Sequence, residues 1–197
     1  MNSQNRGITG LVLAGGQGRR MGSVDKGLVA LNGKPLVRHV VERFEPQVDE
    51  ILINANRNIE QYETLGWPVI RDRIEGFAGP LAGLHAGLSH ARHALIATVP
   101  CDSPFIAPDL VARLVHALEA HSADLAVART SDQPHPVFAL VRRSVLPHLE
   151  RFLNDGGRKI DAWYASLATV EVAFDDEADA FRNINTAAEL EEASGGD

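Results

Sequence analysis

The sequence contains one cysteine, no long hydrophobic run and no apolar leader. Cys101 has no second cysteine to pair with, as is typical of proteins from a reducing compartment. The longest apolar stretches, such as residues 94–99, are far shorter than the roughly 20 residues that span a bilayer. The polar start at residues 1–10 lacks the apolar segment of a signal peptide. These absences predict a soluble cytoplasmic protein with no membrane partner.

Basic residues are also in deficit. The chain has 19 Lys and Arg against 26 Asp and Glu, which gives a formal net charge of −7. A general nucleic-acid binder needs a basic surface to displace the counterions of the phosphate backbone, so we exclude nucleic acid as a partner. Any phosphate recognition must then be local and depend on a few basic side chains in one cleft.

Apolar segments with strand character alternate with amphipathic segments along the 197 residues. We expect strands at 8–14, 50–54, 69–72, 94–102 and 123–129, and helices at 35–44, 80–91, 109–121 and 189–193. This alternation predicts a single-domain α/β fold, with a mostly parallel twisted sheet and helices on both faces. The domain should cover residues 1–197, with flexible ends at 1–7 and 194–197.

The first predicted strand ends in a glycine-rich loop. Four glycines fall within residues 15–22, so the backbone can turn sharply and bring N–H groups against a ligand. Arg19 and Lys26 add positive charge to this loop. Backbone donors and cations together suit a triphosphate. The alternative is an ordinary strand-to-helix turn with both basic side chains in solvent.

Two other phosphate-binding motifs are excluded by single residues. The dinucleotide-binding pattern requires a third glycine where this chain has Met21, and an acidic residue where the second strand ends in Asn54. A P-loop requires Ser or Thr after Gly-Lys, whereas here Gly33-Lys34 is followed by Pro35.

Two carboxylates follow consecutive predicted strands. Asp72 ends the third strand and Asp102 ends the fourth. The carboxyl ends of parallel strands are where such sheets bind ligands. Mg²⁺ takes one or two carboxylates together with substrate phosphates, so the two residues form a candidate metal site. Each Asp could instead be a turn residue or the N-cap of a helix.

Several short motifs occur in the order found in one enzyme family. Residues 13–16, followed by Arg19, Met21, Gly22, Asp25 and Lys26, resemble the signature of nucleotidyltransferases with a Rossmann-like core. Further matches are at 54–57, 72, 79–83, 100–104, 135–136 and 181–186. Together they cover roughly residues 8 to 190 and most resemble the molybdenum cofactor guanylyltransferase family.

The resemblance implies roles for individual residues. On the nucleotide side it implies GTP contacts from Leu13, Ala14, Gly15, Gly16, Lys26, Asn54, Asp72 and Asp102. Asn54 and Asp72 would bind guanine or ribose, which replaces the metal interpretation of Asp72, and Asp102 would hold Mg²⁺. The catalytic residues would be Arg19, Lys26 and Asp102. On the molybdopterin side the resemblance implies Gly79, His135, Arg158, Lys159, Asn183 and Asn185.

The implied reaction transfers GMP from GTP to the phosphate of the molybdenum–molybdopterin cofactor and releases pyrophosphate. It implies Mg²⁺ as cofactor and transient contacts with cofactor-insertion proteins and target molybdoenzymes. Because the attacking phosphate is already ionised, no general base is required. Two alternatives remain open. One is a cytidylyltransferase or sugar-phosphate nucleotidyltransferase on the same fold, although the close cytidylyl relatives usually have Ala where this chain has Gly15. The other is a non-catalytic GTP-binding protein that delivers the cofactor.

The remaining reactive residue types are expected to have structural roles. His85, His90 and His93 are spaced by five and three, which does not match a zinc-binding helix, and we place them at the surface. Cys101 is expected to be a small buried hydrophobic residue at a strand end. Trp163 and Trp67 should lie in the core or a pocket wall. The acidic segment 175–179 is expected to be a solvated loop.

Overall fold

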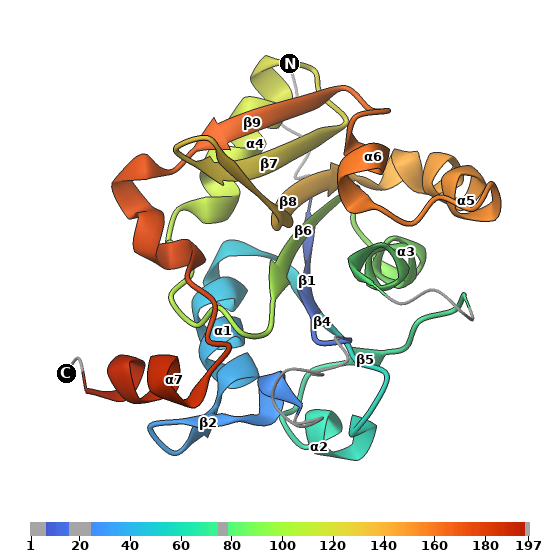
Figure 1. The fold of residues 1–197 in the computed structure, drawn as a ribbon. Coiled ribbons are helices and arrows are strands. Elements are labelled where there is room, and N and C mark those ends of the chain that lie inside the picture. Colours follow the sequence, from blue (N-terminus) through green and yellow to red (C-terminus); the bar gives the residue numbers. More distant parts are fainter. Residues whose placement is uncertain (1–6, 16–24, 75–78, 196–197) are drawn as a thin grey trace.

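The computed structural model describes residues 7–15, 25–74 and 79–195. Its centre is a seven-stranded sheet in the order β5-β4-β1-β6-β8-β7-β9 (Figure 1). The strands are β1 (Ile8–Leu13), β4 (Glu50–Asn54), β5 (Val69–Ile70), β6 (Leu95–Pro100), β7 (Leu125–Thr130), β8 (Gln133–Arg142) and β9 (Thr169–Ala173). Neighbouring strands in this sheet are parallel except where β8 pairs with β6 and β7. The mostly parallel sheet confirms the predicted fold class.

Helices cover both faces of the sheet (Figure 1). One face carries α1 (Leu36–Phe44) and α4 (Leu110–Ala120), and the other carries α3 (Pro80–His90), α5 (Leu146–Asn154) and α6 (Ile160–Tyr164). Successive strand side chains point to opposite faces, so each strand serves both layers of the core. In β1, the fully buried Leu11 packs in the layer of α3 and the fully buried Val12 in the layer of α1.

The strand β8 runs against the other strands of the sheet. The chain reverses at Ser131, which has a φ of 49°. Thr98 of β6 pairs with Ala139 of β8, and β6 ends two residues later at Pro100. The first residues of β8 therefore extend beyond the carboxyl end of β6. The β7–β8 hairpin forms a wall beside that end of the sheet.

Several elements are missing from the sequence-based prediction. Among the small ones are α2 (Ile59–Glu63), α6, and a hairpin of β2 (Ala30–Leu31) and β3 (Lys34–Pro35). The hairpin turn consists of Asn32 and Gly33, at φ values of 50° and 75°. An Asn-Gly pair is the usual signal for a two-residue hairpin turn, so this element could have been found in the sequence.

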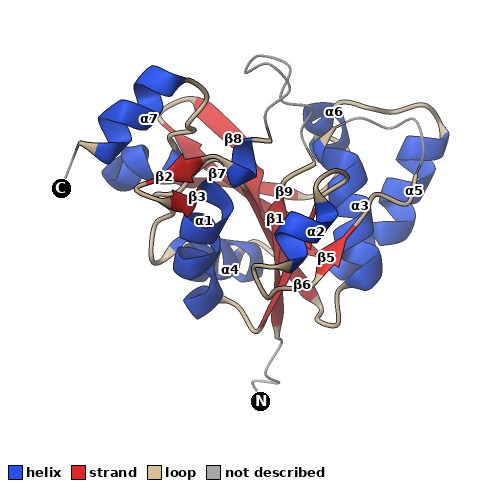
Figure 2. Cartoon of the chain, turned by 90° about the horizontal axis from the view of Figure 1, so that it is seen from below, coloured by secondary structure: helices blue, strands red, loops and turns tan. Residues whose placement is uncertain are grey.

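The last helix, α7 (Ala187–Ser194), lies beside this hairpin (Figures 1 and 2). It begins with a capping box, in which Thr186 Oγ1 accepts from the Glu189 amide and the Glu189 carboxylate accepts from the Thr186 amide. The helix thus starts two residues earlier than predicted. Of the expected flexible ends, Ser194 belongs to α7 and Gly195 is its C-cap, whereas 1–6 and 196–197 lie outside the described residues.

Helix α3 lies unusually close to the sheet because glycines face it. A Cβ at Gly87 would overlap Cδ2 of the fully buried Leu11 in β1. One turn earlier, a Cβ at Gly83 would lie 2.6 Å from Leu13 Cδ2 and would also overlap the Asn54 side chain. The two glycines thus let the helix backbone approach the central strand and the end of β4.

The prediction that His85 lies at the surface is wrong. His85 is 6 % exposed, because α5 covers this side of α3. Its Nε2 lies 3.5 Å from Glu150 Oε1, and within the described residues its Nδ1 has no hydrogen-bond partner. A histidine inside a helix gives no sequence signal that a later helix will cover it. His90 is exposed as predicted, and His93 is half-buried with its Nδ1 3.0 Å from Thr9 Oγ1.

The acidic segment 175–179 is exposed as predicted, but it is not a loop. It forms most of the 3-10 helix η5 (Asp175–Phe181). Both oxygens of Asp176 accept from the Arg113 guanidinium at 3.0 Å, and this guanidinium lies over the Phe174 ring. The ion pair fixes η5 to α4.

Within the described ranges, no helix has the length and apolar character needed to cross a membrane.

The close approach of α3 predicts that a side chain at position 87 is destabilising. Gly87→Val should lower the free energy of unfolding by about 1–3 kcal/mol, because the added methyl groups must displace Leu11 from a packed core. Urea denaturation measures this loss. Gly195→Val is the control, since a Cβ there meets its nearest neighbour at 3.6 Å. Equal stability of the two variants would contradict the packing described for α3.

The two tyrosines of the chain predict a loss of stability in strong base. Burial raises the pKa of both Tyr62 and Tyr164 well above the ordinary value near 10. The unfolded chain releases these protons near pH 10 while the folded chain retains them. The free energy of unfolding should therefore fall as the pH rises above about 10. Tyrosinate absorbance should appear together with loss of the far-ultraviolet dichroism, and absorbance that develops in the native protein would contradict this.

Candidate active site

The candidate site lies at the carboxyl end of β1, where the order of the strands reverses. The chain places β4 and β5 on one side of β1 and β6 on the other. Ligands of open α/β sheets bind at such a reversal, just beyond the strand ends. In this structure the residues at that position are Ala14 and Gly15 after β1, Asn54 at the end of β4, and Asp102 after β6.

A lysine, a carboxylate and an amide meet beside the end of β6. Lys26 Nζ lies 3.2 Å from Asp102 Oδ2, and their side chains are 23 % and 13 % exposed. The same ammonium donates to Asn185 Oδ1. The structure thus brings together one residue predicted for phosphate, one for Mg²⁺ and one for molybdopterin. Arg19, the third predicted catalytic residue, and Gly16 lie outside the described residues.

Lys26 is positioned by the residue before it. Asp25 accepts a hydrogen bond of 2.6 Å from the buried Tyr62 phenol and one of 3.0 Å from the Asn58 amide. A Cβ at Gly27 would overlap the Tyr62 hydroxyl, so glycine is required there. These contacts tie both neighbours of Lys26 to α2. Sequence reasoning gave no such role to Tyr62, because α2 itself was not predicted.

Residues 182–186, called the strap here, cross from η5 to the end of β6. Ile184 N donates to the Asp102 carbonyl at 2.8 Å, and the hydroxyl of the fully buried Ser103 donates to Asn183 Oδ1. With the Lys26–Asn185 contact, both predicted pterin-side asparagines are held against the loop that carries Asp102. The strap has no helical or strand periodicity, so its position could not be read from the sequence.

Asp72 lies on the other side of β1 from Asp102. Its carboxylate accepts from Asn54 Nδ2 at 2.9 Å and from Asn56 Nδ2 at 2.8 Å. The strand order is β5-β4-β1-β6, so about three strand spacings, roughly 14 Å, separate the ends that carry the two carboxylates. One cation cannot bridge them. The initial interpretation of the two residues as a shared metal site is therefore wrong, because strands that are consecutive in the chain are not adjacent in the sheet.

The turn after β1 is fixed by its neighbours. The Ala14 amide donates to the Asn54 carbonyl at 2.8 Å, and the Leu13 carbonyl accepts from the Cys101 amide at 3.1 Å. The Ala14 amide and one lone pair of the Leu13 carbonyl are thus engaged within the sheet. A Cβ at Gly15 would lie 3.0 Å from Asn56 Nδ2 and 3.2 Å from Asn54 Oδ1. Glycine is thus what allows this turn to pass the two asparagines.

His135, near the start of β8, lies in an aromatic cluster. Its ring stacks on Phe181 at 4.7 Å, and its Nε2 is 2.7 Å from Thr130 Oγ1. Partial burial lowers the pKa of His135, which favours the neutral ring.

Gly79 is the N-cap of α3, with a φ of 136° that favours glycine.

The basic residues Arg158 and Lys159 precede α6. Arg158 Nη1 donates to the carbonyls of Gly157 and Leu153 at 2.6 and 3.1 Å, and Lys159 is exposed at the N-cap of α6. The Tyr164 hydroxyl of α6 donates to the Pro136 carbonyl at 2.6 Å. This contact ties α6 to the start of β8, the strand that also carries His135.

Of the two strand-end carboxylates, Asp102 is the better candidate for a metal ligand, because both oxygens of Asp72 already accept from asparagine amides. Within residues 7–15, 25–74 and 79–195, no three His, Cys, Asp or Glu side chains come together to hold a metal. One carboxylate at the strand end suits Mg²⁺, which keeps several waters and takes its other ligands from substrate phosphates. Cys101, next in the chain, is buried as predicted, and burial raises the pKa of its thiol. Burial therefore favours the neutral thiol over the thiolate that would bind a metal or act as a nucleophile.

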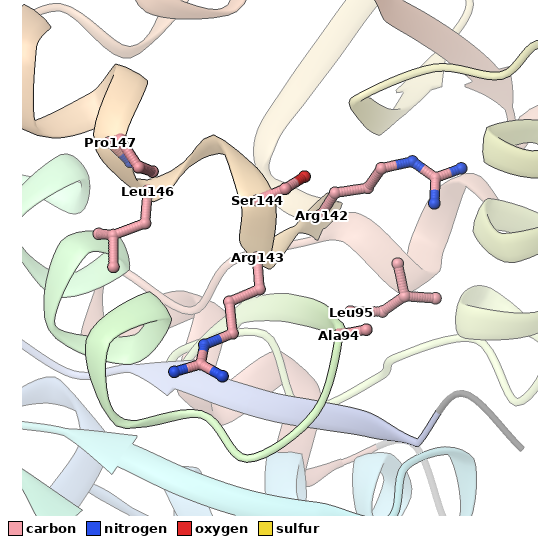
Figure 3. A pocket seen from close by; sticks show the side chains of 7 residues that line it. All are labelled: Ala94, Leu95, Arg142, Arg143, Ser144, Leu146 and Pro147. Carbon is pink, nitrogen blue, oxygen red and sulfur yellow. The ribbon is translucent and has the colours of Figure 1, made fainter.

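A hollow of about 630 Å³ lies at the end of β6 opposite to the candidate site (Figure 3). It is lined by Ala94, Leu95, Arg142, Arg143, Ser144, Leu146 and Pro147. The two guanidinium groups point away from each other, and each Nε donates to a backbone carbonyl. They do not converge on a common anion, so this hollow is not the candidate active site.

Comparison with known proteins gives one family. The MobA-like NTP transferase domain matches residues 10–170. The molybdenum cofactor guanylyltransferase of Cupriavidus necator is 53 % identical, with 93 % of this chain and 94 % of that protein covered. The enzyme of the same name from Shewanella putrefaciens is 48 % identical, with 94 % and 95 % covered.

A solved structure agrees with these relatives. The molybdopterin-guanine dinucleotide biosynthesis protein A of Archaeoglobus fulgidus superposes with a TM-score of 0.78 at 31 % identity, covering 94 % of this chain and 96 % of that one. In both relatives, identity near 50 % extends over almost the whole chain. The protein therefore belongs to the molybdenum cofactor guanylyltransferase family of nucleotidyltransferases.

Proposed function

We propose that the protein transfers GMP from GTP to the phosphate of the molybdenum–molybdopterin cofactor, forming the guanine dinucleotide and pyrophosphate. The observation that carries this proposal is the meeting of Lys26, Asp102 and Asn185 at the reversal of strand order. The ammonium of Lys26, a cation suited to phosphates, contacts both the Asp102 carboxylate, suited to a metal, and the Asn185 amide of the strap. Asp72, with its two amide partners, lies on the other side of β1.

The chemical problem in this reaction is electrostatic. An anionic phosphate oxygen attacks the α-phosphorus of GTP, and the bond from that phosphorus to the oxygen of the leaving pyrophosphate breaks. Catalysis then depends on orientation and charge neutralisation rather than on covalent chemistry. No proton has to be removed from the nucleophile, so His135 has no need to act as a base.

The site residues supply this neutralisation in the proposal. Asp102 would hold Mg²⁺, which supplies charge stabilisation on phosphate oxygens when it is bound. Lys26 would then leave Asp102 for the nucleotide phosphates, and Arg19, from the glycine-rich loop, would assist it. This exchange costs little, because the ammonium replaces one anionic partner by another and its neighbours hold the backbone in place.

In this proposal the nucleotide and the pterin would be bound by different groups of residues. Asn54 and Asp72, with the turn at Leu13, Ala14, Gly15 and Gly16, would hold guanosine. Asn183 and Asn185 of the strap, together with Gly79 and His135, would face the pterin, and Arg158 and Lys159 its phosphate. The product is passed on in this proposal through transient contacts with cofactor-insertion proteins and target molybdoenzymes. The cytoplasmic location inferred from the sequence stays a prediction.

Pyrophosphate release tests the proposal directly. The purified protein is given molybdenum–molybdopterin, Mg²⁺ and one of GTP, CTP, ATP or UTP. We expect release with GTP that stops when the pterin or Mg²⁺ is withheld. Release with CTP instead would indicate a cytidylyltransferase. GTP binding without release by any nucleotide would indicate a delivery protein.

Asp102 provides a test of the metal assignment. Asp102→Ala should lower kcat by roughly 100-fold or more, because a site that neutralises transition-state charge loses its metal ligand. Activity should be measured over a Mg²⁺ titration, and thermal melting should show that the fold is retained. The control is Asp155→Ala, an exposed carboxylate at the end of α5. If Asp102→Ala keeps normal Mg²⁺-dependent turnover, Asp102 is not the metal ligand.

A further inference from the structure

We propose that Asn56 is a specificity-determining positioning residue, which orients the Asp72 carboxylate toward the N1–H and 2-amino donors of guanine. This inference rests on the proposed function, since it assumes that the nucleotide base lies beside Asp72. It assigns a role to a residue that the motif at 54–57 contains but that the candidate ligand set left out.

The first observation is a closed pair of hydrogen bonds. Asn56 Nδ2 donates to Asp72 Oδ2 at 2.8 Å, and Asn56 Oδ1 accepts from the Asp72 backbone amide at 2.9 Å. One side chain thus holds both the backbone and the carboxylate of Asp72. This geometry fixes the direction of the carboxylate relative to the chain, which a single hydrogen bond would not do.

The second observation is how the carboxylate is shared. Asn54 Nδ2 donates to Oδ1 and Asn56 Nδ2 donates to Oδ2, so each oxygen accepts one amide. An ionised carboxylate has about four acceptor directions, two on each oxygen. The amide clamp therefore leaves acceptor capacity on both oxygens. Two parallel donors of one ligand edge can then be received together.

Burial distinguishes the two clamping residues. Asn54 is 2 % exposed and lies inside β4, so it also supports the core. Asn56 is exposed, and its side chain buries no apolar surface that the fold requires. Its two hydrogen bonds to Asp72 thus have no evident purpose in stabilising the core. They are explained by the orientation that they give to the carboxylate.

The third observation places Asn56 next to the nucleotide-side turn. A Cβ at Gly15 would lie 3.0 Å from Asn56 Nδ2. Asn56 therefore lies between this turn and Asp72, at the end of the sheet where ligands bind. A bound base that contacts the turn and Asp72 would pass directly beside the clamp.

The ligand chemistry follows from the two free acceptors. Guanine presents N1–H and the 2-amino group side by side, and an oriented carboxylate can accept from both. Hypoxanthine lacks the 2-amino group and offers one donor on this edge. A site built to accept a ligand N–H discriminates strongly against the analogue that lacks it. A carboxylate that rotates freely would lose this preference before it lost nucleotide binding as such.

The test compares GTP with ITP, whose base is hypoxanthine, on the full chain with Mg²⁺. The variants are Asn56→Ala, Asn56→Asp and, as matched control, Glu63→Ala, an exposed side chain at the end of α2. Calorimetry gives the Kd of each nucleotide, and pyrophosphate release gives KM and kcat. Thermal melting checks that each variant is folded.

We expect Asn56→Ala to weaken GTP binding about tenfold and ITP binding less than threefold, so that the preference for GTP collapses. The loss should appear in KM, with kcat at saturating GTP within about twofold of the parent. Asn56→Asp keeps the shape and the acceptor but replaces the donor by a second negative charge, so its loss of GTP affinity should be at least as large. Glu63→Ala should behave as the parent.

Three outcomes would overturn the inference. Unchanged Kd values for both nucleotides in Asn56→Ala would show that Asn56 does not set specificity, and parallel losses for both nucleotides would show a merely structural role. A parent protein that binds GTP and ITP equally would show that Asp72 does not read the 2-amino group. These results leave the proposed function intact as long as the parent releases pyrophosphate from GTP. A parent that releases none would instead refute the proposed function, and the role of Asn56 with it.

Discussion

The hydrogen bonds that hold β1 between β4 and β6 determine where the candidate residues at these strand ends lie. They place the turn at Ala14 and Gly15 between Asn54 on one side and Asp102 on the other. The same ladder continues into the turn, where the Ala14 amide and the Leu13 carbonyl bond to the neighbouring strands. The site is therefore built on the rigid centre of the sheet, and its catalytic chemistry depends on groups held within fractions of an ångström.

Local sequence patterns predicted the elements well but not their neighbours in space. The strand at 50–54 agrees residue for residue, since its apolar run and flanking turns are local signals. The distance between Asp72 and Asp102 depends instead on strand order, which no local pattern encodes. Burial of His85 depends on α5, and the strap depends on Ser103 and Lys26, far away in the chain. The glycine-rich loop and the strand ends indicated Arg19, Lys26, Asp72 and Asp102, whereas the other site residues came from a family resemblance.

Charge balance links the two halves of the site. Without substrate, Lys26 neutralises Asp102 and also contacts Asn185, so one ammonium joins the candidate metal ligand to the strap. A buried or half-buried charge without a partner is costly, and this arrangement avoids two such charges. On the other side of β1, the Asp72 carboxylate accepts from the neutral amides of Asn54 and Asn56, its partners among the described residues. The Lys26–Asp102 ion pair beside β6 is suited to exchanging partners. The two asparagine amides on Asp72, beside β5, are suited to keeping one geometry.

The contact between Lys26 and Asn185 joins residues that are 159 positions apart. Closing so large a loop is slow, and parallel strands with long crossovers already fold slowly. During synthesis, the nucleotide-side strands emerge from the ribosome long before the strap does. A partly made chain thus possesses Lys26 and Asp102 but not Asn185. Completion of the chain is what brings the three side chains together.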